Sequence, residues 1–263
     1  MAKFTCNFIS YTLQRTVDIT VIVPSVTIPE SMGMGAAEGE KPALTHRKGE
    51  KYPVLYLLHG FGNNHTAWNA YTNVELYAEE RQIAVVCLSA ENKAYVDQPR
   101  DKFYDFVARE LPDFVLGMFP VSDRPEDTYI AGLSMGGYGT LVHALREPER
   151  FTAFGAFSAA VSSFGGNNEE ADPDKEPALL LEKAVKEGRK LPKAYMACGT
   201  EDFLMQADRE FRDKLIAAGA DVTWDQLEGY GHEWRFWDIQ VEKFLQWIEP
   251  LRTDAYAGAV RKV

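Results

Sequence analysis

The chain has 263 residues, 46% of them hydrophobic, and a formal net charge of −11 at pH 7. This length supports one large hydrophobic core and no internal repeat divides it, so we expect a single domain over residues 1–263. The acidic balance, which no long run of Lys or Arg offsets, argues against binding to nucleic acid or to an anionic membrane surface.

The sequence composition also predicts the cellular compartment, the state of the cysteines and the need for cofactors. The N-terminal segment is interrupted by polar residues and no apolar run reaches about eighteen residues, so we expect a cytoplasmic protein without a membrane anchor. Three cysteines, Cys6, Cys87 and Cys198, leave at least one unpaired, and we expect them to be buried, reduced and structural. No Cys/His grouping has zinc spacing, and we predict neither a metal nor another cofactor.

The first elements in the chain are predicted to be two antiparallel strands. The segment FISYTLQRTVDITVIVP alternates apolar and polar residues on both sides of Gln14-Arg15, which is typical of a hairpin at a sheet edge. A polar, Gly- and Ala-rich stretch without periodicity follows at residues 30–51, where we expect an exposed loop insertion.

Beyond residue 51, apolar runs alternate with amphipathic ones. This alternation predicts an α/β fold with a mainly parallel central sheet and helices on both faces. Segment 162–188 has room for a small lid at most, and we expect residues 252–263 to form a weakly attached tail. The predicted strands are 53–60, 84–90, 127–132, 153–160, 193–199 and 221–227, and the predicted helices are 71–81, 103–118, 136–147, 177–187, 203–218 and 233–248.

The stretch AGLSMGGYG, residues 131–139, places Ser134 between Gly132 and Gly136. In a G-x-S-x-G sequence the serine occupies a strained turn from a strand to a helix, where side chains two residues away on either side would collide. A β-prone run precedes this serine and a helical run follows it, as that turn requires. We therefore predict that Ser134 is a nucleophile.

A serine nucleophile needs a base, and five histidines are available. His143 falls inside the helix after Ser134, and His46 falls in the exposed loop. We interpret His59 as a residue that fixes its loop by hydrogen bonds to backbone. His232 alone follows the last strand, in the loop EGYGHEWRFWD, and we predict that it is the base; a helix-capping role is the alternative.

The acid that orients the base is expected at a strand end between Ser134 and His232. Asp202 directly follows the strand 193–199 and gives the chain order Ser, Asp, His that a hydrolase sheet requires. The alternative is that Asp202 only caps the helix that begins at Phe203.

Acyl transfer also needs donors for the oxyanion. We predict the backbone N–H groups of Met135, the residue after the nucleophile, and of Phe61, in the loop after the strand 53–60. Trp68 and Trp234 are candidates for contact with the substrate, although core packing explains them equally well. The covers predicted for the site, loop 30–51 and segment 162–188, are polar, which favours short or compact acyl groups over long fatty chains.

The motifs LYLLHGFGNNHTAW, AGLSMGGYGTL, CGTEDFL and GYGHEWRFW, in this order, resemble the esterase D-like family of α/β-hydrolases, in particular its tributyrin esterase and cinnamoyl (feruloyl) esterase branch. The resemblance covers about residues 4–250. It implies a cofactor-independent serine carboxylesterase for short acyl or hydroxycinnamoyl esters. The family's triad falls on Ser134, Asp202 and His232, and its oxyanion donors fall on Phe61 and Met135.

Other functions stay open at this point. An S-formylglutathione hydrolase-like thioesterase usually carries a cysteine in the loop after the His-Gly pair, and FGNNHTAW has none. An acyltransferase of the same fold would pass the acyl group to an alcohol. A catalytically inert interaction module would have no need of all three residues at strand ends. The expected partner is a small-molecule ester, and the sequence leaves the oligomeric state open, including a homo-oligomer.

Overall fold

The computed structural model describes residues 1–34, 39, 44–46, 48–163 and 172–251. Their main feature is an eight-stranded sheet with the strand order β1-β2-β4-β3-β7-β8-β9-β10. β1 and β2 form an antiparallel hairpin, β2 pairs antiparallel with β4, and the other pairings are parallel. The strands are β1 (Ala2–Ser10), β2 (Arg15–Val23), β3 (Val54–Leu58), β4 (Ala84–Leu88), β7 (Thr128–Leu133), β8 (Ala153–Phe157), β9 (Lys193–Gly199) and β10 (Val222–Leu227).

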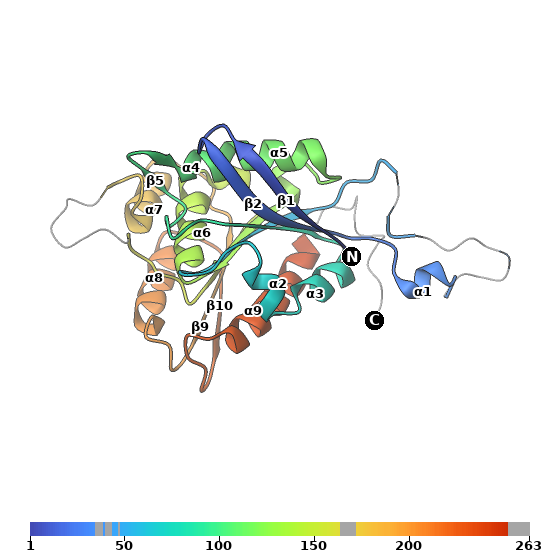
Figure 1. Cartoon of the computed structure of the whole chain (residues 1–263). Coiled ribbons are helices and arrows are strands. Elements are labelled where there is room, and N and C mark those ends of the chain that lie inside the picture. The colour runs from blue at the N-terminus through green and yellow to red at the C-terminus, as the bar shows by residue number, and fades with distance from the viewer. Residues whose placement is uncertain (35–38, 40–43, 47, 164–171, 252–263) are drawn as a thin grey trace.

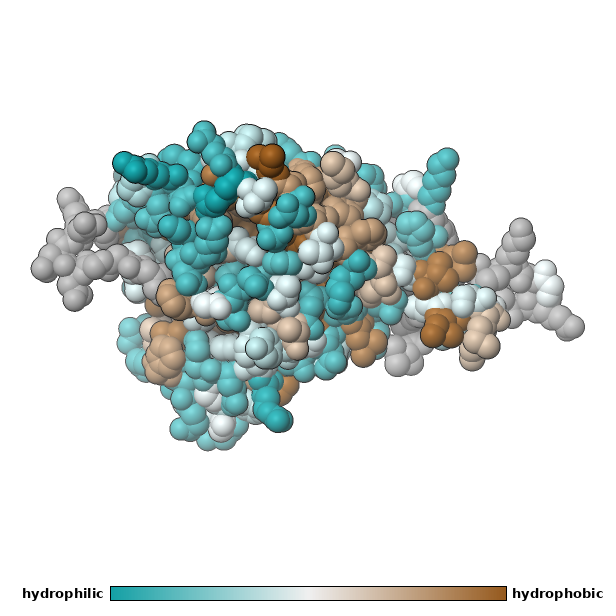
Figure 2. Space-filling model, viewed as in Figure 1, coloured by the Kyte–Doolittle hydropathy of each residue, from teal (hydrophilic) through white to brown (hydrophobic). Residues whose placement is uncertain are grey.

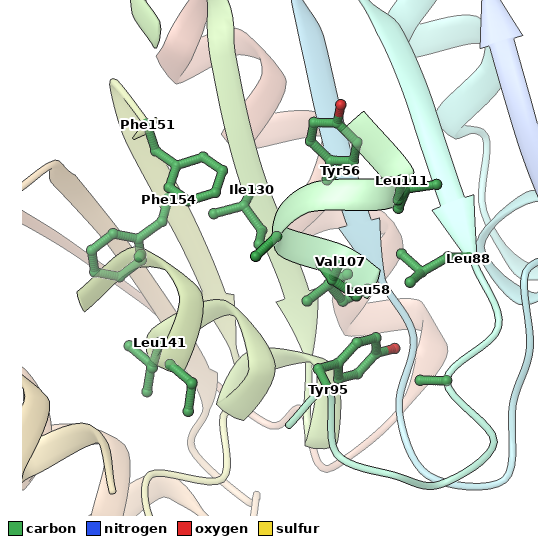
Figure 3. Close-up of a cluster of buried hydrophobic side chains, with 14 of the residues drawn as sticks. Tyr56, Leu58, Leu88, Tyr95, Val107, Leu111, Ile130, Leu141, Phe151 and Phe154 are labelled. Atoms are coloured by element: carbon green, nitrogen blue, oxygen red, sulfur yellow. The ribbon is translucent and has the colours of Figure 1, made fainter. Parts of the chain in front are cut away.

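Helices cover both faces of this sheet (Figure 1). Side chains of β3 point alternately to the two faces of the sheet. Leu55 and Leu57 belong to the buried cluster with α3 and α9, and Tyr56 and Leu58 belong to the cluster with α5 and α6. Figure 3 shows part of the buried cluster that contains Tyr56 and Leu58. The helices are α1 (Ile28–Ser31), α2 (Ala67–Tyr71), α3 (Val74–Glu80), α4 (Phe103–Asp105), α5 (Leu111–Met118), α6 (Met135–Arg146), α7 (Pro177–Lys186), α8 (Met205–Ala217) and α9 (Trp234–Ile248).

The predicted mainly parallel sheet, its N-terminal hairpin and its two helical layers are confirmed. The hairpin turn, however, lies at residues 11–14 rather than at Gln14-Arg15, because Ser10 pairs with Arg15. The carboxylate of Glu110 fixes this turn by accepting hydrogen bonds from the hydroxyl of Ser10 and from the N–H groups of Tyr11 and Thr12. This long-range contact has no local signal in the sequence.

The predicted helix 103–118 is continuous but not uniform. Between α4 and α5 it contains a π-helical turn, Phe106–Glu110, in which the N–H of Leu111 bonds to the carbonyl of Phe106. Pro112 follows directly, and its missing N–H cannot bond back into that turn. The short elements α1, α2 and the pair β5 (Asp97–Gln98) and β6 (Asp101–Lys102) are too short to give a periodic pattern, and sequence analysis missed them.

The predicted loop insertion 30–51 is attached at both ends to the amino edge of the parallel strands. It follows β2, whose last residues pair with the first residues of β4, and it leads into the start of β3. Figure 1 accordingly shows α1 at the opposite end of the molecule from α7. The expectation that this loop covers a site at the carboxyl edge depends largely on residues 35–38, 40–43 and 47, which lie outside the described residues.

The described residues in and directly after α1 include exposed apolar side chains. Ile28, Met32 and Met34 are 64–75% exposed, and Figure 2 shows hydrophobic residues in brown at the place where Figure 1 labels α1. Residues 35–38, 40–43, 164–171 and the predicted tail 252–263 lie outside the described residues. Within the part of the chain that the structure describes, no helix has the length and apolar character needed to cross a membrane.

Candidate active site

Ser134 lies at the carboxyl end of β7, directly before α6. Its backbone has φ 53° and ψ −115°, a conformation that L-residues rarely adopt and that costs on the order of 1–3 kcal/mol. Two backbone hydrogen bonds hold it: the Ser134 N–H donates to the carbonyl of Phe157 at the end of β8 (3.0 Å), and the N–H of Ala160, in the segment after β8, donates to the carbonyl of Ser134 (3.1 Å). The side chain is held at a strained turn and is only partly buried.

The glycines around Ser134 are required by close backbone contacts. A Cβ atom on Gly132 would collide with the carbonyl of Gly136, and one on Gly136 would collide with the carbonyl of Leu58 and lie 2.7 Å from that of His59. α6 therefore packs against the end of β3 at a distance that no side chain permits. This is the steric reason that the G-x-S-x-G pattern predicts.

Asp202 and His232 are in contact at the same edge of the sheet. The Nδ1 atom of His232 lies 2.9 Å from Oδ2 of Asp202, whose side chain is fully buried, whereas 22% of the His232 side chain is exposed. Oδ1 of Asp202 accepts a hydrogen bond from the N–H of Leu204 at 2.9 Å. Because the carboxylate accepts at Nδ1, that nitrogen carries a hydrogen and the Nε2 atom is left as the basic nitrogen.

Backbone pairing brings the two residues together. The loop after β10 is tied to the end of β9 by the N–H of Thr200 on the carbonyl of Leu227 and by the N–H of Glu201 on the carbonyl of Tyr230. Asp202 follows the first strand and His232 follows the second, so these bonds set the distance between them.

The environment of Asp202 favours its charged form. Burial is the largest influence and raises the pKa, but the hydrogen bonds with His232 and with the backbone of Leu204 help to hold the pKa below its ordinary value. Asp202 is therefore an ionised acceptor for His232 at neutral pH.

Two backbone N–H groups are available near Ser134. A Cβ atom built on Gly60 would lie 3.5 Å from the Cβ of Ser134, which places the loop that contains Phe61 beside the nucleophile. Among the described residues, neither the N–H of Phe61 nor that of Met135 has a hydrogen-bond partner. Free N–H groups are what an oxyanion site needs.

The loop at Phe61 is fixed by residues that sequence analysis did not identify as contributors. The hydroxyl of Tyr95 donates to the carbonyl of His59 (2.8 Å), and the N–H of Gly62 donates to Oδ1 of Asn92 (2.7 Å). Asn92 and Tyr95 both have positive φ. The backbone of the segment after β4 is therefore strained at the two residues that bond to this loop. Such contacts cross from one strand end to another and leave no local pattern.

His59 has the structural role that was predicted. Its Nδ1 is 2.7 Å from the carbonyl of Gly60, and its Nε2 accepts the N–H of Ala90 at 2.9 Å. Burial lowers the pKa of His59, which favours a neutral ring. His143 is also buried, donates Nε2–H to the carbonyl of Tyr95 (3.0 Å), and has its pKa lowered to about 3 mainly by burial.

The aromatic candidates differ from one another. Trp68 is fully buried and its Nε1–H donates to the carbonyl of Leu58 at 3.0 Å, so it is a core residue and its predicted contact with substrate is not supported. Trp234 is half-buried and stacks on Tyr71. Phe203, which sequence analysis did not name as a site residue, is 77% exposed and lies 4.7 Å from the His232 ring, centroid to centroid.

A mainly parallel sheet with a strained serine between a strand and a helix, and with an Asp–His pair after later strands, defines an α/β-hydrolase. The chain belongs to the esterase family described as "putative esterase", whose model matches residues 42–251.

Individual relatives agree with this assignment. The chain is 30% identical over 276 residues to the acetyl esterase of Caldicellulosiruptor saccharolyticus, covering 94% of this chain and 98% of that one. Two solved Staphylococcus aureus structures are similar to this chain, and each alignment covers 94% of this chain and 98% of the other chain. They are the fluorophosphonate-binding serine hydrolase FphF (27% identity, TM-score 0.79) and the S-formylglutathione hydrolase FrmB (28% identity, TM-score 0.78).

Proposed function

We propose that this esterase is a serine carboxylesterase in which Ser134 is the nucleophile, His232 the general base and Asp202 the residue that orients the base. The observation that carries the proposal is the hydrogen bond of 2.9 Å between His232 and the buried Asp202, at the same sheet edge as the strained Ser134. A carboxylate that orients a histidine at the sheet edge that also carries a partly exposed serine is consistent with the arrangement that activates a hydroxyl for acyl transfer.

The reaction follows from these groups. Nε2 of His232 removes the proton of the Ser134 hydroxyl as its oxygen attacks the ester carbonyl, and the N–H groups of Phe61 and Met135 stabilise the oxyanion. The imidazolium then protonates the leaving alcohol, which gives an acyl-enzyme. Water, deprotonated by His232, attacks the acyl-enzyme and releases the acid and Ser134.

A short acyl group is the favoured substrate. One relative, 30% identical to this chain, is an acetyl esterase, and the predicted cover 162–188, which follows β8 at the carboxyl edge, is short. Each buried methylene adds about 0.8 kcal/mol of binding only while the cleft has room for it. Compact hydroxycinnamoyl groups are a second class, because Phe203 beside His232 and the 67% exposed Phe61 offer ring surfaces for stacking.

A thioester of glutathione is the alternative substrate, and the likeness to the S-formylglutathione hydrolase favours it. The loop sequence FGNNHTAW, which has no cysteine, argues against it.

We further propose that the protein acts in the cytoplasm on small molecules. The homo-oligomer and acyl transfer to an alcohol stay untested predictions.

One set of measurements separates these substrates. We expect kcat/KM with nitrophenyl esters to be highest for acetyl to butyryl groups and to fall toward palmitoyl, with methyl ferulate and S-formylglutathione assayed in parallel. A steady rise toward palmitoyl would contradict the short-acyl proposal, and faster turnover of the thioester than of every ester would replace it with the alternative. A fluorophosphonate probe should label Ser134 and should not label the Ser134→Ala variant.

A further inference from the structure

The peptide unit between Ser134 and Met135 carries one of the two proposed oxyanion donors, the N–H of Met135. Its carbonyl oxygen, on Ser134, accepts hydrogen bonds from the N–H of Tyr138 (3.0 Å) and from the N–H of Ala160 (3.1 Å). A trans peptide unit is planar, so its C=O and N–H groups point in opposite directions. The groups that hold the Ser134 carbonyl therefore also set the direction of the Met135 N–H.

The two bonds to this carbonyl come from different parts of the fold. The bond from Tyr138 is the first backbone bond of α6, which follows Ser134 directly. The bond from Ala160 comes from the segment after β8, and β8 ends at Phe157. The position of this segment is therefore a constraint on the donor that α6 alone does not supply.

Asp208 of α8 holds the segment after β8 from inside the protein. Its Oδ2 accepts the N–H of Ala159 at 3.0 Å, and both residues are fully buried. Ala159 also packs closely against the first turn of α6, because a Cβ atom on Gly137 would lie only 2.7 Å from the Cβ of Ala159. The segment is thus held between α6 and α8, and the carboxyl of Asp208 supplies a polar contact to α8.

The buried carboxyl of Asp208 can accept this hydrogen bond without carrying a charge. Burial raises the pKa of Asp208 well above its ordinary value, which favours the neutral form. The N–H of Ala159 is buried with it, so loss of the acceptor would leave a backbone donor unpaired away from water. The segment would then shift to bring this N–H to another acceptor.

We propose that Asp208 is a positioning residue that aims the Met135 N–H at the oxyanion by fixing the segment after β8. This inference rests on the proposed catalytic roles of Ser134 and Met135. The contacts lead from the Asp208 carboxyl, through the backbone of that segment, to the Ser134 carbonyl. An oxyanion donor is effective only in a defined direction, so a small rotation of this peptide weakens its bond to the tetrahedral intermediate.

The test compares substitutions of Asp208 that keep or remove the acceptor. Asp208→Asn keeps the shape and an oxygen that accepts the N–H of Ala159, so kcat/KM with nitrophenyl acetate should stay within about twofold of the parental value. Asp208→Leu keeps a branched side chain without an acceptor, and Asp208→Ala removes the acceptor without adding bulk. We expect each of these two variants to lose about tenfold in kcat/KM per active site, with active sites counted by titration with a fluorophosphonate.

A trifluoromethyl ketone inhibitor reports on the oxyanion site directly. The Ser134 oxygen bonds to the ketone carbon, the π electron pair of the carbonyl moves to its oxygen, and His232 takes up the hydroxyl proton, so the adduct resembles the tetrahedral intermediate. We expect its Ki to rise about tenfold in Asp208→Leu and Asp208→Ala and to stay parental in Asp208→Asn. Partial unfolding lowers the number of active sites but leaves the Ki of the folded fraction unchanged, so a higher Ki identifies positioning.

The matched control is Glu110→Leu. Glu110 is also a buried carboxyl that accepts backbone N–H groups, those of Tyr11 and Thr12, at 2.9 Å each. These N–H groups lie in the hairpin turn between β1 and β2, and β4 and β3 separate this hairpin from β7. The control should lose stability in a thermal melt and keep the parental Ki.

Three results would overturn the inference. The first is a parental Ki in both Asp208→Leu and Asp208→Ala, and the second is an equal rise of Ki in Asp208→Asn or in Glu110→Leu. The third is failure of both apolar variants to fold while Asp208→Asn folds, which would assign Asp208 to the fold alone. A Ser134→Ala variant that still hydrolyses the ester would instead overturn the proposed nucleophile.

Discussion

The buried carboxylate of Asp202 and the ring of His232 are 30 positions apart in the chain, yet Nδ1 and Oδ2 lie 2.9 Å apart. If Asp202 orients His232, then Asp202→Asn should lower kcat by about ten-thousandfold while the fold is kept, because an amide can stabilise the wrong tautomer of the ring. Steady-state kinetics with nitrophenyl acetate and a thermal melt measure the two effects. Glu201→Gln, at the exposed neighbour, is the control, and more than a tenth of parental activity in Asp202→Asn would refute the assignment.

Gly136→Ala tests the close packing at the strained serine. The new Cβ would meet the backbone of Leu58 and His59, so we expect a loss of about 3 kcal/mol or more in the free energy of unfolding, together with the loss of activity. Gly117→Ala is the control, because that exposed helical glycine has open space around it and alanine should add up to about 1 kcal/mol. Denaturant unfolding compares them, and equal stability of the two variants would show that Gly136 is not sterically required.

Asn92 is predicted to act through the loop that carries Phe61. Asn92→Ala and Asn92→Gly both remove the acceptor for the N–H of Gly62, and each should lower kcat by about tenfold as the oxyanion donor loses its fixed position. Asn92→Asp keeps an acceptor and tolerates the positive φ, so it should stay close to the parental kcat. If Asn92→Gly kept the parental kcat while Asn92→Ala lost activity, the backbone conformation at residue 92 rather than the side-chain acceptor would be the essential feature.

Asp208 should make stability depend on pH. Burial raises the pKa of Asp208 well above its ordinary value, so its contribution is fully present below the pKa of the unfolded chain and is lost as pH rises through the folded pKa. Asp208→Asn removes this ionisation, and the variant should lose less stability than the parent between about pH 4 and pH 8. Unfolding in denaturant at several pH values measures the slope, and parallel curves for both proteins would contradict the prediction.

Local pattern alone predicted the parallel strands, the helices between them and the serine turn, because each leaves a signal within a few residues. Apolar runs mark strands buried on both faces, and the glycines around Ser134 reflect a steric requirement within one turn. Chain order and placement after strands were enough to select Asp202 and His232.

Only the tertiary structure decided the features that depend on distant pairings. The segment 30–51 begins and ends at the sheet edge away from Ser134 because β2 runs antiparallel to β4, and nothing within the segment's own sequence encodes that attachment. The same holds for the burial of Trp68 and for the support that Asn92 gives to the loop after β3. A sequence pattern reports which face of an element is apolar, whereas the partner of a polar side chain is fixed only when the strands are ordered in the sheet.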